Sequence, residues 1–163
     1  MPTSTAIKVQ QDGSVIFADG TTTPVTLTVP YVDGAASIDG LDYDQTEPIV
    51  VFAKRTFLGV RRGAHRPLTF SFTAYMSEFS SATATSLLDF VRFTNGYSSN
   101  ESTSSTEFDF KTIKVTLESA AIGSDGSASS VAMDDCVVEV SYSEGEPNQF
   151  TVSGTCYGAV TVT

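Results

Sequence analysis

The sequence predicts an all-β fold with one flanking helix, built as an antiparallel β-sandwich or barrel with one long extended loop. Ser and Thr make up 43 of the 163 residues, and the abundance of β-branched side chains favours strands over helices. Apolar and polar residues alternate along most of the chain, with Asp-Gly and Asn-Gly turn signals between the alternating segments. Hydrophobic residues, 40% of the total, are spread along the length, so we expect residues 1–163 to form a single domain.

The first forty residues predict short strands joined by tight turns. Asp12-Gly13 and Asp19-Gly20 are turn signals. Pro24 and Pro30 bracket one strand, because proline is tolerated at strand ends. The expected strands cover residues 7–9, 15–17, 25–31 and 35–38.

Residues 43–67 break the alternation and predict a long excursion from the domain, in the form of an extended hairpin. A continuous apolar run, residues 49–52, is followed by Lys54 and Arg55. A second apolar run, residues 57–60, is followed by two more arginines. These runs lack the clean alternation of a strand with one buried face.

The clearest strand and the one convincing helix follow this excursion. Residues 68–76 alternate strictly between apolar and polar side chains. Residues 85–93 place three apolar side chains at i, i+3 and i+4, a stripe that would lie on a sheet. We expect Ser80 or Ser81 to cap this helix and Asn95-Gly96 to end it.

The C-terminal part predicts further strands and two polar connections. Residues 97–106 are typical of a surface loop or a mobile one, and residues 123–130 of a flexible linker. The expected strands cover residues 113–117, 136–142, 150–156 and 160–162, with a turn at 143–148. This turn places Cys136 opposite Thr155 or Cys156. We expect two reduced core thiols that behave as small hydrophobes rather than a disulfide.

The sequence offers no constellation that supports catalysis, a cofactor or a bound metal. His65, the only histidine, lies in a basic loop with no nucleophile motif around it. Asp134 and Asp135 precede Cys136 but lack the nearby histidine or Cys-x-x-Cys pair of a zinc site. Three more acids resemble a calcium loop but lack its glycine and closing glutamate: Asp39, Asp42 and Asp44. We therefore expect no enzyme.

Composition excludes several other classes. No apolar run approaches the roughly 20 residues of a membrane-spanning helix, and we expect neither a membrane partner nor a secretory signal. The formal net charge of −10 disfavours tight binding of nucleic acid, because an acidic surface repels phosphate.

The charge is segregated along the chain. Residues 11–47 and residues 115–163 each hold seven acids and no base. Residues 48–77 hold five of the nine bases, together with His65, and no acid. A basic and apolar excursion on an acidic domain predicts a head-to-tail contact between copies of the chain. The alternative is a solvated loop whose charge only keeps the protein soluble.

The order of these features resembles the tail tube proteins of long-tailed bacteriophages. The resemblance runs over most of the chain. It begins with an N-terminal hairpin region at 7–17 and a turn-rich stretch at 31–41, followed by the arginine-rich loop. It continues with residues 66–74 (RPLTFSFTA), the helix, and a C-terminal hairpin with Glu144 to Pro147 in its turn.

This resemblance implies a structural virion protein that acts with copies of itself and with other tail proteins. Family members, which are related in fold to type VI secretion tube proteins, form hexameric rings with inner strands joined into one channel. The rings stack into a tube that conducts double-stranded DNA from the capsid into the host. The implied location is the virion tail, assembled in the host cytoplasm. The implied inter-ring contact residues are Lys54, Arg55, Phe57, Arg61, Arg62 and Arg66.

An acidic and hydroxyl-rich channel wall would let DNA pass without holding it. The candidates for the lumen side are Glu139, Ser141, Thr151 and Ser153, whose strands have polar outer faces. Two alternatives stay open. One is another virion β-protein, such as a tail terminator, a distal tail protein or a capsid decoration subunit. The other is a β-sandwich module that binds carbohydrate or protein.

Overall fold

The computed structural model describes residues 13–32, 35–41, 45–75, 78–80, 86–104, 111–119 and 128–163. Antiparallel strands dominate this part of the chain, with one short α-helix and one 3-10 turn, so the predicted all-β class with one helix is confirmed. The strands are β1 (Ser14–Ala18), β2 (Thr26–Pro30), β3 (Ser37–Asp39), β4 (Thr46–Ala53), β5 (Thr56–His65), β6 (Leu68–Tyr75), β7 (Ile113–Ser119), β8 (Ser129–Ser143), β9 (Gln149–Cys156) and β10 (Val160–Val162).

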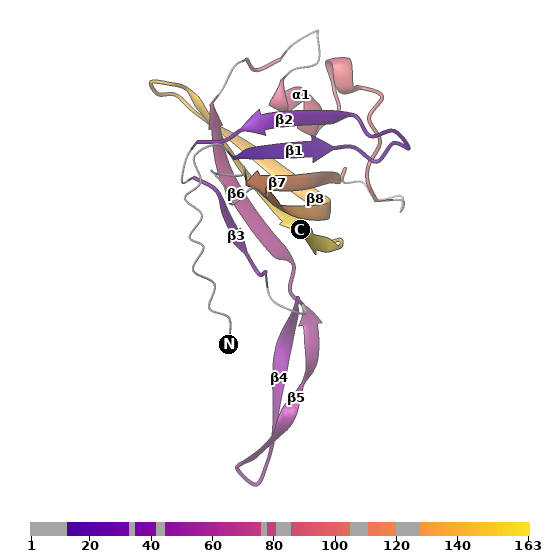
Figure 1. Ribbon diagram of the computed structural model, residues 1–163, viewed down its shortest axis with the longest axis vertical. Coiled ribbons are helices and arrows are strands. Elements are labelled where there is room, and N and C mark those ends of the chain that lie inside the picture. Colours follow the sequence, from indigo (N-terminus) through magenta and orange to yellow (C-terminus); the bar gives the residue numbers. More distant parts are fainter. Residues whose placement is uncertain are drawn as a thin grey trace.

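The main sheet has the strand order β2-β1-β7-β8-β9-β6-β3, with β10 paired to β8. The strands β4 and β5 form a second, two-stranded sheet of their own. An isolated antiparallel bridge joins Tyr31, just after β2, to Ala74 of β6. The N–H of Val32 also donates to the carbonyl oxygen of Thr73 at 2.7 Å. The sheet therefore curls so that the end of β2 returns to β6 (Figure 1).

The core lies on the inner side of this curl. Alternate residues of the strands point inward, as the period of two requires. Phe17 of β1 packs 6.0 Å, ring centre to ring centre, from both Phe72 of β6 and Phe90 of the helix. All three rings are fully buried. At Gly154 of β9 an added Cβ would clash with the Phe70 ring, so glycine makes room for that ring.

The helix α1 (Leu87–Arg92) is shorter than predicted, and both of its ends differ from the prediction. The N-cap is Ser86 rather than Ser80, and the other candidate, Ser81, lies outside the described residues. The hydroxyl of Ser86 donates to the carbonyl oxygen of Phe79 at 2.7 Å instead of to the helix, and this bond ties the helix to the preceding segment.

The C-terminal end of α1 is set by Phe93 rather than by Asn95-Gly96. Phe93 takes the left-handed conformation with φ of 53°, and its side chain is buried. The carboxylate of Asp89 accepts hydrogen bonds from Thr94 Oγ1 at 3.0 Å and Asn95 Nδ2 at 2.8 Å. Burial of the ring and these bonds stabilise a conformation that is otherwise costly for a residue with a Cβ. Gly96 lies instead inside the 3-10 turn η1 (Asn95–Tyr97).

The polar segment after the helix makes specific hydrogen bonds as far as residue 104, which favours the predicted surface loop over the mobile one. Tyr97 is buried, and the hydroxyl of Thr112 accepts the N–H of Ser104 at 2.9 Å. Thr103 Oγ1 donates to Asp135 at 2.9 Å. Hydroxyl side chains in this segment thus form hydrogen bonds with backbone and side-chain groups of the protein, and not with water alone.

Some predicted segments lie outside the described residues. These are the first strand around residues 7–9, most of the linker at 123–130, and two acids of the calcium-like loop, Asp42 and Asp44. No helix in the described part of the chain is long and apolar enough to cross a membrane.

Candidate functional site

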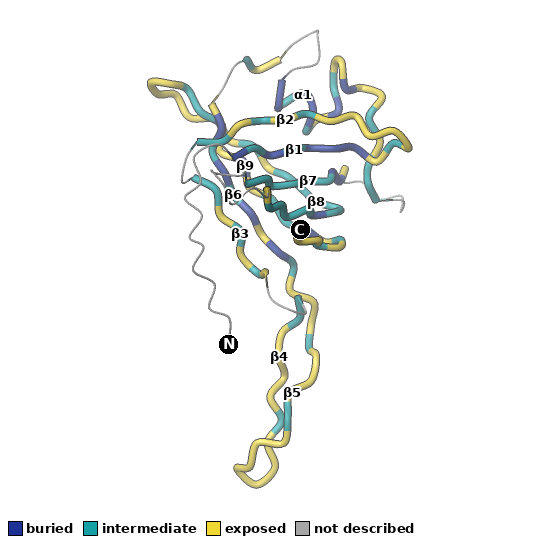
Figure 2. Tube along the Cα trace, in the orientation of Figure 1, coloured by how far each residue is buried: buried dark blue, intermediate teal, exposed yellow. Residues whose placement is uncertain are grey.

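The most prominent feature of the molecule is the hairpin of β4 and β5, called here the projecting hairpin (Thr46–His65). It extends away from the main sheet at one end of the long axis (Figure 1). The N–H of Arg66 donates to the carbonyl oxygen of Gln45 at 2.8 Å and closes its base. Most of its residues are exposed (Figure 2). The predicted excursion at 43–67 is therefore an extended two-stranded arm.

Apolar side chains on the projecting hairpin face outward. Phe52 and Phe57 are paired across the strands, with ring centres 6.1 Å apart in an edge-to-face arrangement. Val50 is paired with Val60, and Val50 shares a face of β4 with Phe52. Phe52 is 63% exposed and Phe57 58%. A soluble monomer rarely exposes this much contiguous apolar surface without a partner for it.

The tip of the projecting hairpin is basic. Lys54 and Arg55 form its two-residue turn, with φ of 44° and 69°. Turns of this kind favour Asn-Gly, because a left-handed conformation costs about 1–2 kcal/mol for a residue with a Cβ. Two long cationic side chains therefore occupy positions whose backbone conformation favours other residues, and strained positions of this kind are often found at contact sites.

Of the six predicted contact residues, five lie on the projecting hairpin and Arg66 lies at its base. Arg61 is paired with Ile49 and Arg62 with Pro48, so the two guanidinium groups leave opposite faces of the ribbon. The structure thus brings cationic and apolar side chains together on one element that projects from the main sheet.

The four predicted lumen candidates form a second group, on the outer side of the main sheet. Glu139 is paired with Ser153, and Ser141 with Thr151, so all four side chains share one face of β8 and β9. All four are exposed. The face continues across β6 and β3, and we call it the polar face. Its central row is Glu139, Ser153, Ser71 and Ser37, and its next row is Val137, Thr155, Thr69 and Asp39.

A shallow cavity of about 410 Å³ lies on the polar face. Two carboxylates, Asp39 and Glu139, and the exposed ring of Tyr157 line it, together with the serine and threonine hydroxyls between them. Sequence reasoning found the β8 and β9 part of this face but not β3 and β6. The missing signal is the order of strands, since only the register places Ser71 beside Ser153 and Ser37 beside Ser71.

The residues weighed for metal or catalytic roles have other partners. Lys114 Nζ lies 3.2 Å from Asp134, and Asp135 accepts the hydrogen bond from Thr103. His65 is exposed at the end of β5, where it pairs with Thr46. Among the described residues, no group of three or more His, Cys, Asp and Glu side chains is arranged to hold a metal ion.

Cys136 and Cys156 are directly opposite one another across β8 and β9, as predicted, and both are buried free thiols. The Cys156 thiol donates to the carbonyl oxygen of Asp134 at 3.1 Å. The hydrogen bond with Cys156, together with burial, raises the pKa of Cys136 above that of an ordinary thiol. Cys136 is therefore held in its neutral form, which is typical of an unreactive core cysteine.

Sequence reasoning missed one group of exposed aromatic rings. The alternation of β8 groups Tyr142 with its core-facing residues, yet Tyr142 is 43% exposed, and its ring centre lies 4.9 Å from that of Phe79.

Comparison of the chain with protein-family models, with curated proteins and with solved structures finds no match.

Proposed function

We propose that this protein is a structural subunit that assembles with copies of itself into stacked rings, which form a tube. The projecting hairpin carries the proposal, because it exposes apolar and cationic side chains that the main sheet does not cover. Burying a phenylalanine or leucine side chain contributes about 1.5–3 kcal/mol to the free energy of association. The exposed residues of one hairpin can therefore supply most of the binding free energy of a specific contact. The rings are hexameric if they follow the family that the sequence resembles.

The polar face supports the second half of the proposal, which is passage of DNA through the tube of a virion tail. Hydroxyl groups keep water on this face, and its acids, Asp39 and Glu139, repel phosphate. The described part of the face carries no lysine or arginine. A channel wall of this kind would let a duplex slide, because phosphate contacts from basic side chains are what hold DNA on a protein.

The test is electron microscopy and sedimentation of the purified protein, followed by charge reversal on the projecting hairpin. We expect rings or tubes of uniform bore from the unmodified chain. The double variant Arg61→Glu, Arg62→Glu should not stack, while its circular dichroism spectrum stays unchanged because the main sheet is untouched.

The matched control changes the net charge equally but on the body of the molecule. Arg92→Glu with Lys111→Glu reverses two exposed cations near the helix and should assemble like the unmodified chain. A chain that stays monomeric at high concentration contradicts the proposed function. Normal tubes from the Arg61, Arg62 variant contradict the docking role of the projecting hairpin.

The second candidate function is a carbohydrate-binding module, and the cavity on the polar face favours it. Hydroxyls, two carboxylates and the 58% exposed ring of Tyr157 are groups that can bind sugar hydroxyls and pack on a sugar ring. Binding of the purified protein to a glycan array, lost in the variant Tyr157→Ser, would favour this module over the tube subunit.

A further inference from the structure

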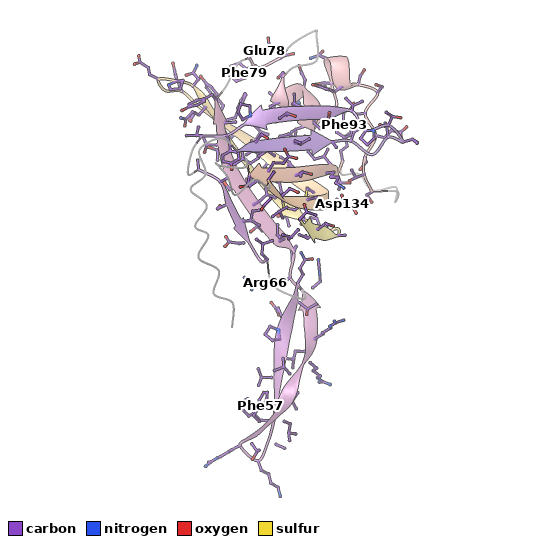
Figure 3. The ribbon with its side chains drawn as sticks, in the orientation of Figure 1. Phe57, Arg66, Glu78, Phe79, Phe93 and Asp134 are labelled. Atoms are coloured by element: carbon purple, nitrogen blue, oxygen red, sulfur yellow. The ribbon has the colours of Figure 1, made fainter. Side chains whose placement is uncertain are left out.

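A second cluster of exposed aromatic rings lies at the end of the body opposite to the projecting hairpin. Figure 3 shows Phe79 and Glu78 at one end of the molecule and Phe57 at the other. Phe79 is 49% exposed and Tyr75 54%. The Phe79 ring packs edge-on against Tyr142, and it packs on the buried ring of Phe150 at 6.0 Å.

The register of β6 explains why the two clusters are far apart. The strand begins at Leu68, two residues after the base of the hairpin, where it pairs with Cys156. It ends at Tyr75, where it pairs with Gln149 beside the turn between β8 and β9. Eight residues of strand span roughly 26 Å at about 3.3 Å per residue. The rings therefore lie a whole strand length from the hairpin base.

The surface around these rings is acidic. Glu144 and Glu146 are exposed in the turn between β8 and β9, and Glu78 precedes Phe79. A cavity of about 160 Å³ adjoins the rings, lined by Leu27, Val29, Pro30, Tyr75, Glu78 and Phe150 among others. We call this surface the aromatic pole; it consists of Tyr75, Glu78, Phe79, Tyr142, Glu144 and Glu146.

We propose that the aromatic pole is the surface on which the projecting hairpin of a second copy of this chain docks. This inference rests on the proposed function and names the partner surface that the proposed function leaves open. Exposed rings at the pole match the exposed rings Phe52 and Phe57 of the hairpin. Acids at the pole match the cations at the hairpin tip and sides, Lys54, Arg55, Arg61 and Arg62.

The polar face is a poorer partner for the hairpin, although it also carries two acids. Seven of the eleven residues that line its cavity carry a hydroxyl of serine or threonine or a carboxylate. Covering these hydroxyls with Phe52, Phe57 and Val60 would remove water from them without supplying hydrogen bonds, which costs free energy. The aromatic pole offers apolar contact and opposite charge at the same place.

Because the hairpin and the pole lie at opposite ends, the contact is heterologous. Each docked pair leaves one unused hairpin and one unused pole, so copies add head to tail without closing on themselves. A tube built in this way grows along the direction in which the hairpin projects.

Charge reversal at the pole tests the inference in the full-length chain. Glu144→Lys with Glu146→Lys should prevent stacking, as Arg61→Glu with Arg62→Glu does. Mixing the two defective variants in equal amounts should restore tubes, because each reversed hairpin then meets a reversed pole and each native hairpin a native pole. Sedimentation measures both results. Failure of the mixture to assemble would overturn the pairing of these two surfaces.

A pair of tyrosine variants separates the role of the rings from that of the charges. Tyr142→Ser at the pole should raise the concentration needed for assembly by at least about tenfold, as expected for an aromatic contact at the centre of an interface. Tyr157→Ser removes a tyrosine from the polar face that is more exposed than Tyr142, 58% against 43%, and should leave that concentration unchanged. Equal effects of the two variants would count against the pole.

The outcomes distinguish this inference from the proposed function. If the unmodified chain forms tubes and Glu144→Lys, Glu146→Lys forms them equally well, the pole is not the docking surface and the tube subunit stands. If the unmodified chain stays monomeric, both proposals fail.

A photoreactive benzoylphenylalanine in place of Phe57 should cross-link to the turn between β8 and β9 of another, isotopically distinct copy. Cross-links to Ser153 or Thr69 would place the hairpin on the polar face instead.

Discussion

Asp19 is a buried carboxylate that joins three separate segments of the chain. Its Oδ1 accepts hydrogen bonds from the N–H of Val25 at 2.7 Å and from Thr21 Oγ1 at 2.9 Å. Its Oδ2 accepts the N–H of Glu101 at 3.3 Å. One side chain therefore fixes the turn between β1 and β2 and ties the segment after η1 to it.

We expect Asp19→Ala to lower the free energy of unfolding by about 1–3 kcal/mol, because it removes the acceptor of three partly buried hydrogen bonds. Urea denaturation followed by circular dichroism measures the change. Asp39→Ala, which removes an exposed acid from the polar face, is the matched control and should stay within about 0.5 kcal/mol of the unmodified chain. Equal effects of the two variants would show that Asp19 has no special structural role.

Some features of single residues can be predicted from the sequence, and others cannot. The pairing of Cys136 with Cys156 follows from the position of one turn, because a hairpin register is fixed once its turn is known. The left-handed Phe93 has no such local signal. Its conformation depends on burial of its ring and on Asp89 holding the next two residues, which are tertiary circumstances.

At the scale of elements, the projecting hairpin is the unit most independent of the rest. It pairs only within itself in the described part of the chain, and its base is closed by the hydrogen bond between Arg66 and Gln45. Its residues contribute nothing to the main core, whose members lie in the larger sheet, in α1 and in η1.

Replacing residues 46–65 by a short Gly-Ser linker should therefore leave the main sheet folded and abolish assembly. The ends of the hairpin already lie close together, so the linker need span only a short gap. We expect the urea midpoint to change little and the sedimentation coefficient to be that of an unstacked species. Loss of the cooperative unfolding transition in this variant would show that the hairpin is part of the folding unit.

At the scale of the whole molecule, the basic and acidic residues that are segregated along the sequence are also segregated in space. Phe57 of the basic hairpin and Glu78 lie at opposite ends of the long axis (Figure 3), and Glu144 and Glu146 belong to the turn between β8 and β9, beside the end of β6 that is farther from the hairpin. The net charge of −10 therefore describes an acidic body with one basic arm.

Assembly through such an arm should weaken as salt is added. Raising sodium chloride from about 0.1 M to about 1 M shortens the Debye length from about 10 Å to about 3 Å and screens the attraction between hairpin and pole. We expect the concentration needed for assembly, measured by sedimentation, to rise over this range. Assembly that strengthens steadily with salt would indicate that apolar contact alone drives it.

The strand class, most of the inward-facing residues and the basic arm could be predicted from the sequence, because alternation and charge order are local properties of the chain. The neighbours of each strand could not, since register and strand order depend on contacts between distant segments. That order places Ser37 and Ser71 in one row with Ser153 on the polar face, and it puts Phe79, the ring that Tyr142 contacts, at the opposite end of the molecule from Phe57 (Figure 3). The position of the proposed docking surface is thus a property of the fold, whereas the basic arm can be predicted from the sequence alone.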